Sequence, residues 1–217
     1  MRYPGALWYP SPVRHRPRPA TWGIVIHWTA GHRAGDLAAL TSGRVDVQFY
    51  VTKAGEVYQL LDSDSQAWHA FATANTYCIG IEHEGSGEPW TKEQFDASVK
   101  LARWLCEHYA IPVRHVDPPA SWHGLYGHRD LAGIDGNNHT DSVPEGIGWA
   151  KYIAAIHAEG KPKLIRAPYL VWKEWALGEG RFKGLGRFNR KARPKNWLPG
   201  VPKSYWTRLR AFLARRK

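Results

Sequence analysis

The amino-acid sequence predicts an α/β protein with one body of about 160 residues and a basic C-terminal extension. Along the body, short β-branched apolar runs are interspersed with segments of helical periodicity. Residues 161–217 carry 17 basic and two acidic side chains, whereas residues 1–160 carry 13 basic and 17 acidic ones. These balances of +15 and −4 predict two functional parts, 1–160 and 161–217, joined by a hinge at residues 160–163, G-K-P-K.

In the first third of the chain, the sequence pattern predicts an arm, a buried strand, a helix and a hairpin. Residues 1–22 are rich in Pro and Arg and are expected to form an extended arm on the surface. The apolar run 23–28, G-I-V-I-H-W, predicts a buried strand, and residues 35–42 a short helix. Segments 45–52 and 56–61 flank K-A-G-E, which predicts a β-hairpin with glycine in its turn.

A further strand is expected over Cys78–Glu84, C-I-G-I-E-H-E. Side chains alternate between the two faces of a strand, so Glu82 and Glu84 would share one face and His83 would lie on the other. Cys78 and Cys106 both stand alone in apolar surroundings, which predicts two buried free thiols and a reducing compartment.

Two helices are expected in the second half of the body. Thr91 and Gln94 have the spacing of a capping box. One helical stripe then contains Phe95, Val99, Ala102, Leu105 and Tyr109. This helix must end before Pro112. A second helix is expected over residues 147–158.

A loop rich in ionisable side chains is the strongest chemical signal. Residues 124–141 read G-L-Y-G-H-R-D-L-A-G-I-D-G-N-N-H-T-D, and a lone His27 ends the first core strand. A hydrolytic zinc site needs about three such ligands and an open position for water. Spacing alone does not choose among His128, His139 and the three aspartates. The alternative is a hydrogen-bonded core histidine beside a solvated turn.

Four separated motifs resemble, in order, those of the zinc-dependent N-acetylmuramoyl-L-alanine amidases of the type-2 amidase and peptidoglycan-recognition-protein superfamily, especially phage endolysins. The matching segments are I-V-I-H-W-T-A-G (24–31), Q-F-Y-V-T-K-A-G-E-V-Y-Q-L (48–60) with A-W-H-A (67–70), N-T-Y-C-I-G-I-E-H-E-G (75–85), and G-H-R-D-L (127–131) with H-T-D (139–141). The resemblance covers about residues 20–158 and implies a central mixed β-sheet flanked by helices.

The resemblance also implies the roles of individual residues. His27, His128 and Asp141 would bind Zn²⁺, and Glu82 matches the acid/base position. His139 stands where many relatives have Lys and would stabilise the oxyanion. Asp130 and Asp135 would then stay off the metal.

The groove for glycan or stem peptide would be lined by Trp68, His69 and Asn75, although packing of this loop over the sheet is the alternative. The sequence departs from relatives at Val47-Gln48, where Ser-x-His or Tyr-His is common. We therefore do not expect a Tyr or His side chain at that point to contribute to the transition state. The remaining histidines are expected to be structural or exposed, with His123 as a candidate behind the metal ligands.

The resemblance implies a peptidoglycan hydrolase that cleaves the amide between N-acetylmuramic acid and L-alanine, or, as alternatives, a non-catalytic binding module or a cytoplasmic muropeptide-recycling amidase. The N-terminal sequence M-R-Y-P-G-A-L-W-Y-P-S-P has no signal-like apolar segment, and no apolar run is long enough for a transmembrane span. We expect a monomer that waits in the host cytoplasm and reaches the wall after holin-type release.

The basic extension contains Trp residues at 172, 175, 197 and 206 among its cationic side chains. The favoured hypothesis is attachment to anionic wall polymers, with aromatic rings contacting sugars. An amphipathic helix on anionic membranes, non-specific contacts to nucleic-acid phosphates and simple packing on the body are the alternatives. No sequence-specific nucleic-acid partner is expected, since the body is slightly acidic.

Overall fold

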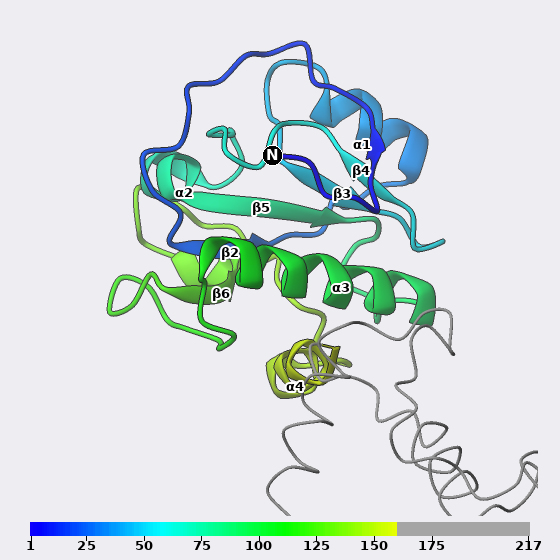
Figure 1. Cartoon of the computed structure of the whole chain (residues 1–217), viewed down its shortest axis with the longest axis vertical. Helices are drawn as coiled ribbons and strands as arrows, with labels where there is room; N and C mark the ends of the chain where they lie inside the picture. The colour runs from blue at the N-terminus through cyan, green and yellow to red at the C-terminus, as the bar shows by residue number, and fades with distance from the viewer. Residues whose placement is uncertain (160–217) are drawn as a thin grey trace, which may run out of the picture. The chain divides into compact units, whose positions relative to one another are not determined.

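The computed structural model describes residues 1–159 (Figure 1). The elements in chain order are β1 (Leu7–Trp8), β2 (Gly23–Ile26), α1 (Arg33–Leu40), β3 (Phe49–Val51), β4 (Val57–Gln59), α2 (Phe71–Tyr77), β5 (Cys78–His83), α3 (Lys92–Tyr109), β6 (Gly124–Gly127), a 3-10 turn (His128–Leu131) and α4 (Trp149–Glu159). The alternation of strands and helices confirms the predicted fold class.

The strands form one mixed sheet in the order β1-β4-β3-β5-β2-β6. β2 lies between β5 and β6 and is parallel to both, and β3 is also parallel to β5. β3 and β4 form the predicted antiparallel hairpin. Gly55 in its turn has φ +82°, a conformation that favours glycine.

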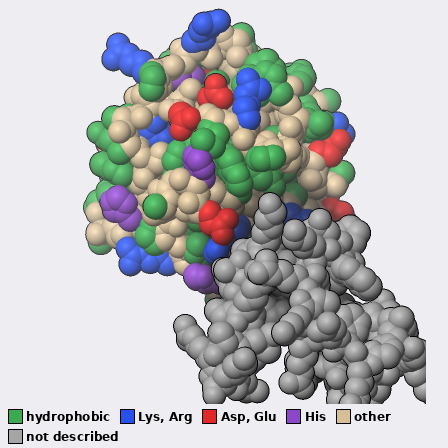
Figure 2. Space-filling model, in the orientation of Figure 1, with side chains coloured by type: hydrophobic (Ala, Val, Ile, Leu, Met, Phe, Trp, Pro, Cys, Tyr) green, Lys and Arg blue, Asp and Glu red, His purple; other side chains and the backbone are tan. Residues whose placement is uncertain are grey.

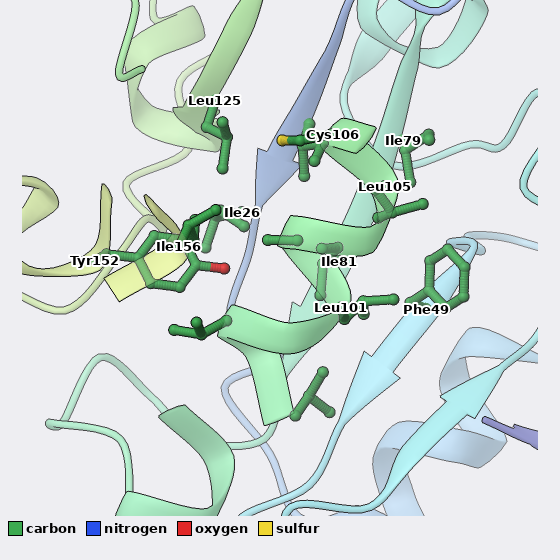
Figure 3. Packing of buried hydrophobic residues seen from close by; sticks show 14 of the residues in the cluster. Ile26, Phe49, Ile79, Ile81, Leu101, Leu105, Cys106, Leu125, Tyr152 and Ile156 are labelled. Carbon is green, nitrogen blue, oxygen red and sulfur yellow. The ribbon is translucent and has the colours of Figure 1, made fainter. Parts of the chain in front are cut away.

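One face of the sheet packs against α3 and α4, which lie beside each other in Figure 1. Ile26, Ile81 and Leu125 project from three neighbouring strands into this core and meet Leu101 and Leu105 of α3 (Figure 3). The opposite face is covered in two places. α2 packs over β2, β5 and β6, and α1 packs over β3 and β4. The sheet is therefore buried on both sides, which explains why its strands read as continuous apolar runs.

Helix α3 begins where the capping signal predicted. The Thr91 side chain accepts a hydrogen bond from the backbone N–H of Gln94 at 3.1 Å. The reciprocal half of the capping box is absent, because the Gln94 amide instead donates to the carbonyl oxygens of Val51 and Glu84. Gln94 thus ties the start of α3 to β3 and to the residue after β5.

The N-terminal arm is more integrated than the sequence indicated. It contributes β1, which pairs parallel with β4 at the edge of the sheet. The Arg18 guanidinium donates to the carbonyl oxygen of Cys78 at 2.5 Å and to that of Ser63. Burial lowers the pKa of Arg18, although nearby Tyr109 and Asp64 oppose this shift. The arm is therefore fastened to the sheet.

Both cysteines are free and buried, as predicted. The proposed hinge at 160–163 and the basic extension 161–217 lie outside the described residues. On the face of the body seen in Figure 2, acidic and basic side chains are interspersed. No helix within residues 1–159 combines the length and the apolar character needed to cross a membrane.

Candidate metal centre

Three chemically reactive side chains are brought together by the register of the parallel strands. Ile26 of β2 pairs with Ile81 of β5 and with Gly127 of β6. The next residue in each of the three segments therefore falls in one row. These residues are Glu82, His27 and His128. Because side chains alternate along a strand, the row faces away from the α3 core, toward the side covered by α1 and α2.

Asp141 reaches this row from a distant part of the chain. The backbone N–H of Arg129 donates to the carbonyl oxygen of Asp141 at 2.9 Å, which holds the 141–142 segment against the end of β6. Gly127 allows the approach. A Cβ at this position would overlap the Ser142 side chain and would lie only 2.9 Å from the Ser142 Cα. The absence of a side chain at Gly127 thus brings Asp141 to the two histidines.

The three groups form a compact triangle of potential ligand atoms. His27 Nδ1 is 3.1 Å from His128 Nδ1 and 2.9 Å from Asp141 Oδ2. His128 Nδ1 is 3.2 Å from Asp141 Oδ1. Ligands in a tetrahedral zinc site at about 2.0–2.1 Å from the ion are separated by roughly 3.3 Å. Within residues 1–159, this buried set has the composition and spacing to hold a metal ion.

The protonation preferences of His27 and Asp141 suit a cation. Burial lowers the pKa of His27 and favours the neutral imidazole. Burial alone would raise the pKa of Asp141, but hydrogen bonds from His128 and His27 outweigh it and lower that pKa. Neutral imidazoles and an ionised carboxylate are the forms that coordinate zinc. The ionised Asp141 carboxylate therefore contributes a negative charge that favours a cation.

His69 and His83 hold His27 from two sides. His69 Nδ1 lies 3.0 Å from His27 Nε2, so the nitrogen that faces away from the triangle has a partner. Gly80 makes room for this ring, since a Cβ there would be 2.8 Å from His69 Nδ1. On the other face of the sheet, His83 Nδ1 donates to the His27 carbonyl oxygen at 3.0 Å, and its Nε2 is 2.8 Å from Ser98 Oγ. Such outer contacts fix the orientation of a metal ligand.

Glu82 has the environment of a proton acceptor poised at the site. Its carboxylate is half-buried, and Oε2 is shielded from solvent without a hydrogen-bond partner in the described part of the chain. Burial, followed by the negative charges of Asp141 and Asp36, raises its pKa well above the ordinary value. A carboxyl group with a raised pKa can take up a proton and later release it near neutral pH.

His139 lies on top of the triangle. Its ring stacks on that of His128 with centroids 4.2 Å apart and planes inclined by 11°. His139 Nδ1 is 3.6 Å from Asp141 Oδ1, and 52% of the side chain is exposed. The ring is therefore beside the candidate ligands but open to an incoming molecule.

These groups open into a cavity of about 490 Å³. Its lining includes Trp28, Thr29, Trp68, His69, Glu82, His128, His139 and Asp141. Trp68 is 48% exposed and stands at the wall, where its backbone N–H donates to Asp46 at 2.7 Å. Trp68 therefore lines the cavity, and its contact with a substrate stays a prediction.

The other two predicted groove residues have contacts that the sequence did not reveal. His69 lines the cavity, and its Nδ1 also lies 3.0 Å from His27 Nε2, so it supports a metal ligand as well. Asn75 is absent from the residues that line the cavity. Its side-chain oxygen accepts hydrogen bonds from the backbone N–H groups of His69 and Ala70, which fixes the turn after Trp68. Asn75 therefore supports the wall rather than forming it.

The two remaining loop aspartates have partners away from the triangle. Asp130 accepts from the backbone N–H of Gly127 at 2.7 Å and pairs with His115. Asp135 accepts from the backbone N–H of Thr73 at 2.8 Å. His123 was wrongly expected behind the ligands: it is exposed and its ring lies near that of Trp22. The residues behind His27 are His69 and His83 instead.

A family model described as N-acetylmuramoyl-L-alanine amidase matches residues 17–144. The 1,6-anhydro-N-acetylmuramyl-L-alanine amidase AmpD of Enterobacter cloacae is 29% identical over 114 residues, which cover 49% of this chain and 54% of the relative. The chain therefore aligns with only about half the length of this curated relative.

Solved structures support the fold. A selenomethionine AmpD derivative has a TM-score of 0.57 at 23% identity, with 71% of this chain and 96% of the other covered. The Staphylococcus aureus hydrolase AmiA, in complex with its ligand, has a TM-score of 0.59 at 15% identity, with 72% and 83% covered. Since the family model spans more than half of the sequence, the chain belongs to the N-acetylmuramoyl-L-alanine amidase family.

Proposed function

We propose that this protein is a zinc-dependent peptidoglycan hydrolase that cleaves the amide bond between N-acetylmuramic acid and L-alanine. The observation that carries the proposal is the buried triangle of His27, His128 and Asp141 at a cavity that also contains Glu82. Membership in the amidase family supports the choice of bond. Because the three ligand positions and the carboxylate are all present, hydrolysis is favoured over binding alone.

The donor set fits zinc. Two imidazole nitrogens and one carboxylate oxygen are typical ligands of catalytic zinc sites, which keep a further position open. The edges of 2.9–3.2 Å between these atoms are close to those of a tetrahedral site. A zinc ion held there would polarise the scissile carbonyl group and lower the pKa of a water molecule.

The protein's own residues would carry the proton transfers. Glu82 would take a proton from the attacking water and then deliver it to the departing amine of L-alanine. Its raised pKa suits both steps, because a more basic carboxylate accepts the proton more readily and the carboxylic acid can still donate it. His139 would donate a hydrogen bond to the developing oxyanion from its exposed position beside the triangle. Trp68 would contact the glycan or the stem peptide at the wall of the cavity.

Digestion of purified sacculi tests the reaction. Mass spectrometry should detect stem peptides with a new amino terminus at L-alanine and glycan strands with free lactyl carboxyl groups. The matched control is Glu82→Gln, which keeps the size of the side chain and removes its charge. Its activity should fall about 10²–10⁴-fold while its zinc content stays the same. Cleavage at another bond, or a Glu82→Gln variant within fivefold of wild type, would contradict the proposal.

We further propose that the full chain acts on the intact wall as an endolysin. It would be synthesised in the host cytoplasm and would reach the wall by holin-type release. The charge balance of +15 over residues 161–217 supports attachment to anionic wall polymers. The match to a relative named as a 1,6-anhydro-N-acetylmuramyl-L-alanine amidase favours a second candidate, the recycling of muropeptides.

A comparison of two substrates separates these candidates. An endolysin should solubilise intact sacculi and should lose this ability when the chain is truncated after residue 160, while it still cleaves soluble muropeptides. A recycling enzyme should prefer anhydro-muropeptides and should be indifferent to the truncation. Full lytic activity of the truncated chain on intact cells would exclude the wall-attachment role of the extension.

A further inference from the structure

Backbone strain in the body is concentrated near the candidate metal centre. Among residues 1–159, four that are not glycine have positive φ: Ala30 (57°), Phe71 (63°), Ala110 (54°) and Asp135 (53°). Ala110 follows α3 in the left-handed conformation that commonly ends a helix. Ala30 lines the cavity. Phe71 is the most unusual, because a bulky aromatic residue rarely adopts this conformation unless its surroundings hold it there.

Phe71 lies beside the two histidines that stack at the site. Its ring centroid is 6.0 Å from that of His139, with the planes inclined by 65°. It is 6.3 Å from the ring of His128, on which His139 stacks. Edge-to-face contacts of this kind are favourable for aromatic rings. Phe71 therefore lies beside the stacked pair, at nearly equal distances from the His139 and His128 rings.

The strained segment is also connected to the loop that carries His139. The backbone N–H of Thr73, two residues after Phe71, donates to Asp135 Oδ2 at 2.8 Å. Asp135 is itself strained, and the chain runs from it to His139 in four residues. The backbone N–H of His139 donates to Asn137 Oδ1 at 2.9 Å. These bonds fix the main chain of the loop but leave the direction of the half-exposed His139 ring to its side-chain contacts.

We propose that Phe71 is a positioning residue that holds the His139 imidazole over His128, ready to meet the substrate carbonyl. The inference rests on the role proposed above for His139 in hydrolysis. A negative φ at Phe71 would redirect its Cα–Cβ bond and withdraw the ring from His139. The strained backbone therefore has a local function, and the 38% exposure of Phe71 reflects its place at the edge of the site.

Nuclear magnetic resonance of the full chain tests the contact without any need for activity. The imidazole C–H signals of His139 are assigned by their loss in His139→Gln and compared in wild type, Phe71→Gly and Phe71→Ala at one fixed pH. Both Phe71 variants should shift these signals, because the ring current of Phe71 disappears and the imidazole gains freedom. Unchanged His139 signals would overturn the proposal.

The two Phe71 variants differ chiefly in how well they tolerate a positive φ. Glycine accepts a positive φ at little cost, whereas alanine does not. Phe71→Gly should therefore melt above Phe71→Ala, by about 2–4 °C for a domain of this size. Ala110→Gly is the matched control, since it relieves the same conformation at the end of α3. It should raise the melting temperature without changing activity or the His139 signals.

Kinetics separate positioning from direct substrate contact. Phe71→Gly should lower kcat about tenfold and leave KM within about twofold, because misplacement of a catalytic group slows the chemical step. The double variant Phe71→Gly/His139→Gln should be no slower than His139→Gln alone. Phe71→Tyr should retain most of the wild-type rate. A raised KM with unchanged kcat, or additive losses in the double variant, would overturn the positioning role. If the wild-type protein hydrolysed no peptidoglycan, the proposed function would be rejected. The magnetic resonance comparison would still decide whether Phe71 holds His139.

Discussion

Gly127→Ala is the most informative single substitution, because Gly127 ends β6 directly before His128 and faces the segment that supplies Asp141. A methyl group there would overlap the Ser142 side chain and would lie 2.9 Å from the Ser142 Cα. Carbon atoms in contact are normally about 3.5–4.0 Å apart. Even with the Ser142 side chain moved aside, the two backbones must separate by roughly 0.6–1.1 Å.

A displacement of this size exceeds what a zinc site tolerates, since bond lengths normally stay within about 0.2 Å of their ideal values. Gly127→Ala should therefore weaken zinc binding at least about tenfold, in line with the cost of disturbing the support of a ligand. Overpacking should also cost about 1–3 kcal/mol of unfolding free energy. This corresponds to a fall in melting temperature of about 2–12 °C.

Zinc affinity is measured by competition with a chromophoric chelator, and stability by thermal unfolding. Gly35→Ala is the control: it lies in α1, and its new methyl group would meet nothing within 4 Å. It should be neutral or slightly stabilising. Ser142→Gly should partly rescue Gly127→Ala, because it removes the side chain that the methyl group meets first. Wild-type zinc affinity and stability in Gly127→Ala would refute the idea that close backbone approach assembles the site.

Three other outcomes follow from the same geometry. His69→Ala removes the partner of His27 Nε2 and should reduce zinc affinity about 10–100-fold with little change in fold. Chelator competition measures the affinity and circular dichroism the fold. Unaltered zinc affinity would show that His27 needs no such support. EDTA should abolish amide cleavage, and added Zn²⁺ should restore it; activity that survives complete removal of the metal would argue against the zinc proposal. Thr91→Ala removes the α3 cap and should lower the unfolding free energy by about 1 kcal/mol, measured by thermal unfolding, without altering kcat. A lower kcat would mean that α3 influences the site.

Much of the secondary structure could be predicted because its signals are local. The I-V-I run of β2, the hairpin around Gly55 and the cap at Thr91 each depend on a few neighbouring residues. The partial burial of Phe95 and the full burial of Val99 follow from helical spacing. The two-residue strand β1 escaped prediction because its pairing with β4 depends on contacts across some fifty residues of sequence.

The candidate metal centre required more than local pattern. The loop at 124–141 offered two histidines and three aspartates, and the family resemblance singled out His128 and Asp141. The structure supplies the physical reason: Asp130 and Asp135 are occupied by backbone N–H groups, whereas Asp141 faces the histidines. Sequence spacing could not distinguish the three aspartates, because the role of each carboxylate depends on the groups that the fold places beside it.

The sequence by itself determined the α/β class, the main helices and the chemical types of the ligands, because composition and periodicity are properties of the chain. Only the tertiary structure decided how those ligands meet. Parallel register placed Glu82, His27 and His128 in one row, and the bare backbone of Gly127 admitted Asp141. It also gave His69 a second contact, to His27, since a contact between the residue after β2 and a distant loop exists only after the chain has folded.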